Sequence, residues 1–331
     1  MSKHTRSAAF ALALAAASPA VPMPPHPAAA QTAPAARPAG VSAFEITDPD
    51  GGTSLLLGVV RIGDPKALQP AMSVIQGAKR VIVEGEAGAG DGPLAGFVED
   101  VDPGAVEALQ RTGKLGRARW TAHLTGEDIA LLRQWAACQA REAGTPERAE
   151  GLLEYLLALK PARAASAVAQ PCPGALINPR SDLLAARARA TGIPVVALES
   201  PEEVRRWQER LASTVDEGAF AAAIRSSLRP SGRQALDDTI RAINAGDFDE
   251  VARISRRVAP TPGAADAMDR IMARERNAVW LPRLERALRG GAAVVLVGAA
   301  NLPGPGGLLD LLRRDGYRVE PVLVPAAPQR R

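Results

Sequence analysis

Short runs of apolar residues alternate with longer segments of helical periodicity along most of this chain. The runs have the length of β-strands and show no regular alternation of polar and apolar positions. Unbroken apolarity indicates strands that are covered on both faces, as in a sheet flanked by helices. The sequence therefore predicts an α/β fold with a mainly parallel or mixed central β-sheet and a helical middle region. The predicted strands cover residues 54–60, 80–83, 194–198, 292–298 and 317–324.

Capping signals mark the starts of the predicted helices. Thr125 and Asp128 precede a helical pattern in the arrangement of a capping box, with aspartate in place of the usual glutamate. Ser200 and Glu203 form a fuller box, with proline at the first helical position. Pro282 lies inside the last long helical pattern, so we expect that helix to be kinked or split.

The first thirty residues have the features of a secretory signal peptide. Lys3 and Arg6 precede an apolar core, and small residues at positions 28–30 suit cleavage before Gln31, with cleavage after Ala20 as the alternative. Residues 31–42 are predicted to form a flexible alanine- and proline-rich segment, residues 43–325 the α/β domain, and residues 326–331 a basic tail. We therefore expect a periplasmic or secreted protein.

Composition narrows the possible partners. The 331 residues are 47% apolar, which is enough for a substantial core. Loss of Lys3 and Arg6 with the signal peptide lowers the formal net charge from +4 to +2, and the remaining arginines are interleaved with acids. We therefore expect no nucleic-acid partner. No segment after the signal peptide reaches the ~20 apolar residues that a membrane span requires.

The two cysteines, Cys138 and Cys172, can pair if the protein is exported to an oxidising compartment. A disulfide that closes a loop of this length would stabilise the fold by roughly 4 kcal/mol in the chain-entropy model. The alternative is two small, buried, reduced side chains.

Four polar side chains directly follow apolar runs. They are Arg61, Glu84, Glu199 and Asn301. Because ligands of open α/β sheets bind beyond the carboxyl ends of the strands, these side chains could converge on one cleft. The alternative is that each only marks the end of a strand, and Glu199 also directly precedes the cap residue Ser200.

Histidine is too scarce for several common catalytic sites. His4 and His26 lie in the predicted signal peptide, which leaves His123 alone in the mature chain. One histidine cannot form a multi-histidine zinc site, and the chain has no Gly-x-Ser-x-Gly motif. The glycine-rich segment 301–307 lacks the spacing of nucleotide-binding loops and predicts a tight turn. We therefore expect neither a metal nor a cofactor.

Several blocks along the chain resemble, in order, the TraB/GumN family, which is related to the Tiki ectodomains. The blocks are residues 44–58, 81–84, 192–199, Arg276-Asn277 with Trp280, 297–308 and 316–319. The resemblance covers about Ala43 to Val324, and the block at 297–308 is its most specific part. Family members typically have Gly-x-x-His at the first strand end and Gly-Ala-Ala-His at the late one. In the Tiki branch such histidines, with acidic residues, are associated with a divalent metal and peptide hydrolysis.

In this chain both of those histidines are replaced, by Arg61 and Asn301. By position, the resemblance carries over the remaining members of the candidate cleft: Gly58, Gly298, Glu84, Glu199, Arg276 and Asn277. We expect Arg61 either to neutralise carboxylates that face a metal in relatives or to point to solvent.

Two functional hypotheses follow from this pattern. The first is a ligand-binding or protein-interaction module with a degenerate metal site. The second is a divergent hydrolase that uses Glu84 or Glu199 as a catalytic base, either without a metal or with a divalent ion held by carboxylates. The sequence names neither a ligand nor a partner protein.

Overall fold

The computed structural model describes residues 40–60, 64, 66–85, 100–170, 172 and 180–327. The predicted signal peptide, Arg61 and the last four residues of the predicted basic tail lie outside the described residues.

A six-stranded mixed sheet forms the centre of the fold, with the strand order β4-β3-β5-β2-β1-β6. The neighbours β4, β3, β5 and β2 are parallel, whereas β1 is antiparallel to both β2 and β6. The predicted α/β class with a mixed sheet is confirmed. The strands are β1 (Gly40–Thr47), β2 (Thr53–Val59), β3 (Arg80–Gly85), β4 (Val195–Glu199), β5 (Ala293–Gly298) and β6 (Arg318–Pro325).

Strand β1 was not among the strands predicted from the sequence. It begins at Gly40, inside the segment that was predicted to be flexible, because Gly40 and Val41 pair with Pro325 and Val324 of β6. The partner strand lies at the other end of the chain, so the local sequence carries no sign of this pairing.

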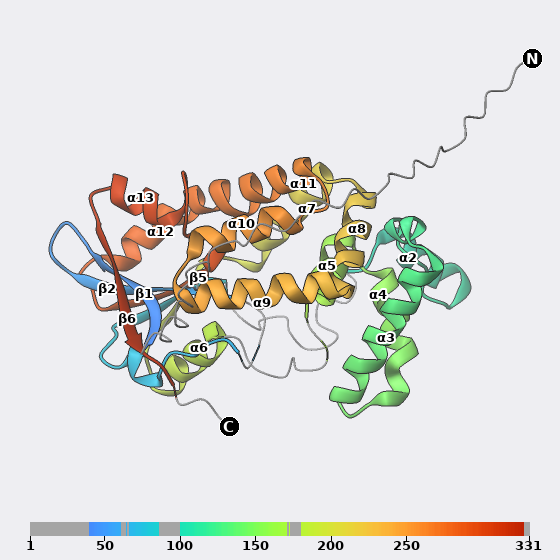
Figure 1. The fold of residues 1–331 in the computed structure, drawn as a ribbon, viewed down its shortest axis with the longest axis horizontal. Helices are drawn as coiled ribbons and strands as arrows, with labels where there is room; N and C mark the ends of the chain where they lie inside the picture. Colours follow the sequence, from blue (N-terminus) through green and yellow to red (C-terminus); the bar gives the residue numbers. More distant parts are fainter. Residues whose placement is uncertain are drawn as a thin grey trace, which may run out of the picture. The chain divides into compact units, whose positions relative to one another are not determined.

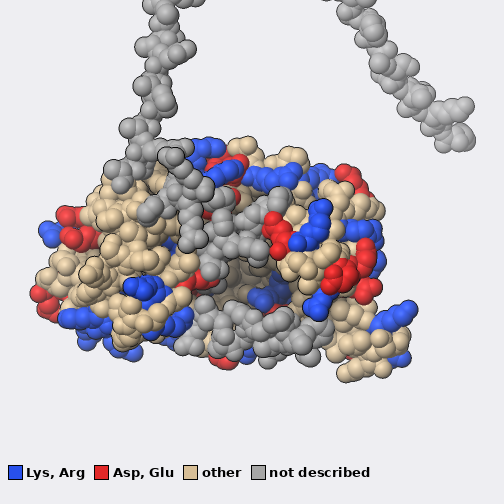
Figure 2. Space-filling model, turned by 90° about the horizontal axis from the view of Figure 1, so that it is seen from below, with Lys and Arg blue, Asp and Glu red and all other residues tan. Residues whose placement is uncertain are grey.

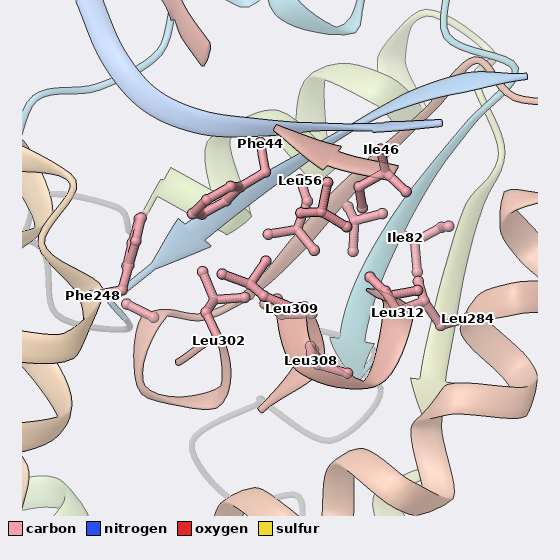
Figure 3. Close-up of a cluster of buried hydrophobic side chains, with 14 of the residues drawn as sticks. Phe44, Ile46, Leu56, Ile82, Phe248, Leu284, Leu302, Leu308, Leu309 and Leu312 are labelled. Atoms are coloured by element: carbon pink, nitrogen blue, oxygen red, sulfur yellow. The ribbon is translucent and has the colours of Figure 1, made fainter. Parts of the chain in front are cut away.

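Helices cover both faces of the sheet (Figure 1). On one face, side chains of α9 (Pro230–Ala245), α10 (Phe248–Val258), α12 (Arg276–Leu288) and α13 (Leu308–Arg314) pack against strand residues. These are Phe44, Leu56, Ile82 and Val295. Figure 3 shows this core, in which apolar side chains from the sheet and the helices point toward one another. On the other face, α6 and the short helix η1 pack against a second apolar cluster. Cover on both faces explains the unbroken apolar runs of the parallel strands.

The helical middle region has a core of its own. Side chains from α2 to α5 and from α8 form a separate buried cluster around Trp120, whose indole Nε1 donates to the carbonyl of Leu159 at 2.8 Å. The helices are α2 (Pro103–Thr112), α3 (Gly126–Glu142), α4 (Ala149–Ala158), α5 (Pro161–Val168), α6 (Arg180–Ala190), α7 (Pro201–Thr214), α8 (Glu217–Leu228), α9 (Pro230–Ala245), α10 (Phe248–Val258), α11 (Pro262–Ala267), α12 (Arg276–Leu288) and α13 (Leu308–Arg314). Short 3-10 helices cover η1 (Met72–Ile75), η2 (Arg119–His123), η3 (Pro146–Arg148) and η5 (Ala299–Asn301), and the π-helix η4 covers Met268–Glu275.

Both predicted capping boxes are present. Thr125 and Asp128 cap α3 reciprocally, and Ser200 and Glu203 do the same for α7. Pro282 lies inside α12, which runs without a break from Arg276 to Leu288, so the predicted split is wrong, whereas the alternative, a kink, stays a prediction. The proline lies at the middle of α12, and Trp280 and Leu284, on either side of it, pack in the buried core.

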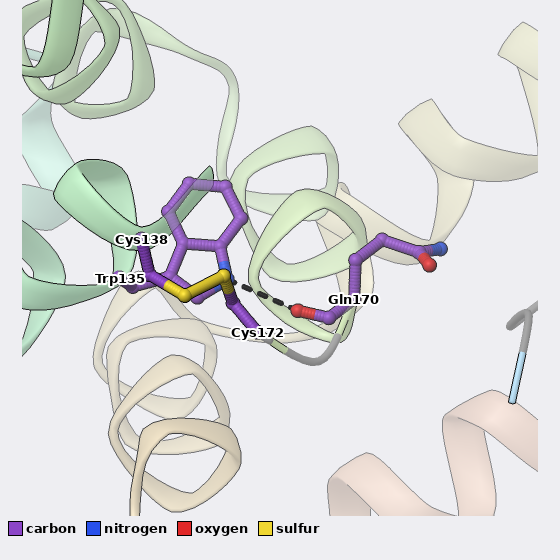
Figure 4. The surroundings of a disulfide bond; sticks show 4 residues. All are labelled: Trp135, Cys138, Gln170 and Cys172. Atoms are coloured by element: carbon purple, nitrogen blue, oxygen red, sulfur yellow. Dashed lines mark hydrogen bonds between the residues drawn. A yellow bond between two sulfur atoms is a disulfide. The ribbon is translucent and has the colours of Figure 1, made fainter. Parts of the chain in front are cut away.

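A disulfide joins Cys138 of α3 to Cys172, which follows α5, and the predicted pairing is confirmed. The Cα atoms are 6.0 Å apart. Beside it, the indole Nε1 of Trp135 donates to the carbonyl of Gln170 at 3.0 Å (Figure 4). The disulfide and this hydrogen bond tie the end of α5 to α3.

Candidate functional site

Two buried glutamates at the ends of adjacent parallel strands face one arginine. Glu84 lies near the end of β3, and Glu199 is the last residue of β4. Arg276, the first residue of α12, donates from Nε to Glu199 Oε2 at 3.0 Å and from Nη2 to Glu199 Oε1. The same Nη2 lies 3.6 Å from Glu84 Oε2. We refer to Glu84, Glu199 and Arg276 as the ion-pair cluster.

All three members of the ion-pair cluster are buried. Their exposed fractions are 6% for Glu84, 3% for Glu199 and 7% for Arg276. Burial alone would lower the pKa of Arg276, but the hydrogen bond to Glu199 and the charges of both glutamates outweigh it and raise the pKa above its ordinary value. The guanidinium is therefore a permanent cation between two carboxylates.

Trp280 supports the ion-pair cluster from the next turn of α12. Its indole Nε1 donates to Glu199 Oε2 at 3.1 Å, and the guanidinium carbon of Arg276 lies 4.5 Å from the centroid of its ring. This stacking adds a cation–π contact in a site from which water is largely excluded. One helical turn thus supplies both the cation and a neutral donor to the same carboxylate.

The other glutamate accepts hydrogen bonds from the end of β5. Glu84 Oε1 accepts from the backbone N–H of Gly298 and, at 3.3 Å, from Nδ2 of Asn301 in η5. A Cβ atom at Gly298 would lie only 2.8 Å from Glu84 Oε1 and 3.0 Å from Asn301 Nδ2. A glycine is required here because only the bare backbone lets the carboxylate approach this closely.

Arg283 anchors the end of β4 from the same helix. It donates to the carbonyl of Leu198 at 2.6 Å and to both carboxylate oxygens of Glu203 at 2.7 Å. The hydrogen bonds that Glu203 accepts from Arg283 and from the backbone N–H of Ser200 lower its pKa to about 2. The capping box of α7 and the helix α12 therefore fix the strand end that carries Glu199.

Asn277 ties the glycine-rich loop to the site. Fully buried, it donates from Nδ2 to the carbonyls of Asn301 at 2.9 Å and Gly306 at 3.1 Å. Gly304 and Gly306 have φ angles of 77° and 78°, and the backbone N–H of Gly307 donates to the carbonyl of Gly304 at 2.9 Å. The loop is therefore a tight turn, as the sequence predicted. Asn277 Oδ1 is buried without a hydrogen-bond partner among the described residues.

Gly58 lies under helix α10, where a Cβ atom would be 2.4 Å from Cε1 of Phe248. Its carbonyl accepts from Nη1 of Arg180 at 3.3 Å, and the other Nη atom of Arg180 donates to the carbonyl of Leu68. Burial lowers the pKa of Arg180 to about 10. Gly58 therefore serves close packing at the end of β2. Phe248 packs against its Cα, and Arg180 binds its carbonyl.

The structure brings together most of the residues that the sequence placed in one cleft. Glu84 and Asn301 are hydrogen-bonded, and Glu84 and Glu199 share Arg276. Arg61 lies outside the described residues, so its expected contact with carboxylates stays a prediction.

The sequence did not assign the neutralising role to Arg276. This residue lies far along the chain from both glutamates, and only its place in a resembling block marked it. The contribution of Trp280 was missed in the same way, although the one-turn spacing from Arg276 was visible. The buried Arg180 carried no signal at all, because an arginine at the start of a helical pattern is ordinarily exposed.

The described residues do not fit a divalent metal site. Nowhere in the described ranges do three or more His, Cys, Asp or Glu side chains come together as potential ligands. The carboxylates of the ion-pair cluster already bind a guanidinium, and Asn301 presents N–H rather than a ligand atom to Glu84. The arrangement can neutralise the two buried carboxylates and hold the backbone at the carboxyl ends of the parallel strands in place.

A cavity of about 1150 Å³ lies beside this site. Ala300 and Asn301 line one part of it, and helices α3, α5 and α7 to α11 supply most of the remaining wall. Seen from below, the molecule is hollowed, and basic side chains reach into the hollow (Figure 2). Asn301 is hydrogen-bonded to Glu84 and also lines the cavity, so a single residue links the ion-pair cluster to the cavity.

No helix in the described part of the chain combines the length and apolarity needed to cross a bilayer. Comparison with curated proteins and with solved structures gave no match. The model of the TraB/PrgY/gumN family matches residues 43–321, which include every member of the ion-pair cluster and the glycine-rich loop. The chain therefore belongs to the TraB/PrgY/gumN family.

Proposed function

We propose that this protein is an exported ligand-binding member of its family in which an ion-paired carboxylate site stands where relatives would hold a metal. The observation that carries the proposal is the binding of Arg276 to Glu199, with Glu84 also within reach of the same guanidinium. A buried carboxylate pair requires compensating positive charge, because ionised groups are costly to remove from water. Arg276 supplies that charge from within the chain.

Asn301 supports the same proposal. It stands at the position where the resembling proteins have a histidine, and its amide nitrogen donates to Glu84. An amide N–H is a hydrogen-bond donor and has no lone pair for a metal ion. In this orientation the residue stabilises an ionised Glu84 carboxylate through Nδ2.

The cavity supports a binding role. Its volume of about 1150 Å³ is slightly larger than the roughly 300–1,000 Å³ of most small-molecule sites. It is lined mainly by apolar side chains with a few polar groups, which is the usual composition of a ligand pocket.

Export is supported by the signal-like first thirty residues and by the disulfide between Cys138 and Cys172. Disulfides persist in oxidising compartments and are rare in the cytosol.

The second candidate is a hydrolase that uses Glu84 or Glu199 as a general base. The convergence of two carboxylates next to a large cavity is the observation that favours it. In this reading the arginine would have to release one carboxylate when substrate binds, so Glu84, with the longer contact of 3.6 Å, is the better base.

Metal content tests the proposal directly. The purified protein should retain no stoichiometric divalent metal, and micromolar Mn²⁺ or Zn²⁺ should leave its thermal unfolding temperature unchanged. The variant Arg61→His with Asn301→His restores the histidine pattern and serves as the comparison, since we expect metal to stabilise it. A wild-type protein that binds one equivalent of metal, and loses it on Glu84→Gln, would overturn the proposal in favour of the hydrolase.

A further inference from the structure

The wall of the 1150 Å³ cavity is built mostly from helices and small apolar residues. Twelve alanines line it, and their short side chains fill little of the space between the helices. Two methionines, Met268 and Met272, add flexible apolar surface, and Met268 is 47% exposed. Flexible thioether side chains let a site adapt to an apolar ligand of irregular shape.

Several hydroxyl groups in the wall are already bonded to backbone carbonyls of their own helices. Ser227 donates to the carbonyl of Ala223 at 3.0 Å, and Thr239 donates to the carbonyl of Ala235 at 2.8 Å. The backbone groups of the lining helices are bonded within those helices. An extended peptide would bury its own N–H and C=O groups against such a wall with few partners, which is costly. An apolar chain has no such requirement.

Three arginines and two acidic residues, Glu127 and Asp269, line the cavity. Arg229 precedes α9 and Arg233 lies in its first turn, while Arg256 lies near the end of α10. Arg256 is paired with Asp266 at 2.6 Å and with Asp269 at 3.7 Å, and Arg229 is 4.0 Å from Glu127.

Among the described residues, Arg233 has no acidic partner. The N-terminus of α9 also lacks a side-chain cap, so its free N–H groups add positive potential at this end. The cavity thus combines an apolar body with one cation in its wall, Arg233, that no described acid neutralises.

The length of the apolar body follows from helix geometry. Residues from position 229 to position 239 of the α9 region line the cavity, which corresponds to about 15 Å at the rise of an α-helix. Ala300 and Asn301, beside the ion-pair cluster, form another part of the wall.

We propose that this cavity binds a single-chain amphiphile, with its apolar chain between α8, α9 and α10 and its anionic headgroup at Arg233. The ligand class is that of long-chain fatty acids. This inference rests on the proposed binding function. The two can fail separately, because metal content tests the proposed function and the experiment below measures only lipid binding.

The experiment uses the full mature chain after removal of bound lipid. Titration with a dansyl-labelled undecanoic acid should give saturable fluorescence at one equivalent, and palmitate should displace the probe. The uncharged alcohol of the same chain length should displace it roughly tenfold less well, because it lacks the charge-assisted contact. A short apolar peptide should not displace it.

Two substitutions locate the site. Ala223→Phe fills the cavity from α8 and should abolish probe binding, whereas Ala186→Phe, on an exposed position of α6 outside the cavity, should leave it unchanged. Arg233→Gln should weaken palmitate about tenfold without weakening the alcohol. Arg241→Gln, on the same helix but paired with Asp238, should have no effect. Circular dichroism and thermal unfolding confirm that each variant is folded.

Several outcomes would overturn the proposal. They are the absence of saturable binding, equal binding by Ala223→Phe and Ala186→Phe, or displacement by the peptide rather than by palmitate. Equal loss of acid and alcohol binding in Arg233→Gln would overturn the assignment of the headgroup. In each case wild-type metal content still reports separately on the ion-pair cluster.

Discussion

Replacing Arg276 by methionine removes the cation of the ion-pair cluster while keeping most of the apolar stem. Glu199 would then lose both hydrogen bonds from the guanidinium and keep only that from Trp280. Two carboxylates would remain in a site where each is less than a tenth exposed. The folded state should therefore be destabilised far more than by an ordinary loss of a surface ion pair.

The size of the effect follows from burial. Removal of one partner from a buried ion pair costs about 3–5 kcal/mol, since the other charge is left uncompensated. Loss of the stacking on Trp280 adds on the order of 1 kcal/mol. A total of about 4–6 kcal/mol is a large part of the 5–15 kcal/mol by which typical domains are stable.

Arg283→Met is the matched control. It lies two turns further along α12 and also holds a glutamate through two hydrogen bonds, but its side chain is 41% exposed. Because water screens this ion pair, its loss should cost about 1 kcal/mol, and loss of the hydrogen bond to the Leu198 carbonyl about 1 kcal/mol more. Urea unfolding at pH 7, followed by circular dichroism, gives both values, and the urea dependence of the unfolding free energy should stay constant if only stability changes.

A second-site change tests the cause. Adding Glu199→Gln to Arg276→Met removes one uncompensated charge, so the double variant should recover at least about 2 kcal/mol relative to the single variant. If Arg276→Met costs no more than Arg283→Met, or if the double variant recovers nothing, the ion-pair cluster is not electrostatically coupled as inferred.

Three further predictions concern other parts of the fold. Reduction of the Cys138–Cys172 disulfide should lower the free energy of unfolding by roughly 4 kcal/mol, and an unreduced, unfolded sample should titrate no free thiols. The Asp128 carboxyl has a pKa of about 2, lowered by its arginine partner and opposed by burial, so its contribution is present above pH ~4 and lost as the pH falls toward 2. Asp128→Asn should accordingly cost about 1–2 kcal/mol at pH 7, and the difference from the wild type should vanish near pH 2. Gly298→Ala, whose Cβ would lie 2.8 Å from a carboxylate oxygen of the ion-pair cluster, should destabilise by about 1–3 kcal/mol. Gly151→Ala, in open space within α4, should instead stabilise by about 0.5–1 kcal/mol.

The sequence by itself determined the features that depend on local chemistry. Both capping boxes were readable, because the bonds they make join residues three positions apart. The parallel strands were readable from their apolar runs, since cover on both faces leaves no position for a polar side chain. The glutamates at two strand ends were readable for the same reason, as the first charged residues beyond buried segments.

The tertiary structure decided which distant residues meet. β1 forms because it pairs with β6 at the opposite end of the chain, and no local pattern indicates that pairing. The cation that compensates Glu199 is Arg276, 77 positions away, rather than a residue near either strand end. The cavity likewise depends on how alanine faces of separate helices pack against one another. Ion pairing, strand pairing and cavity formation all depend on distances in space, and the sequence constrains those distances only through the completed fold.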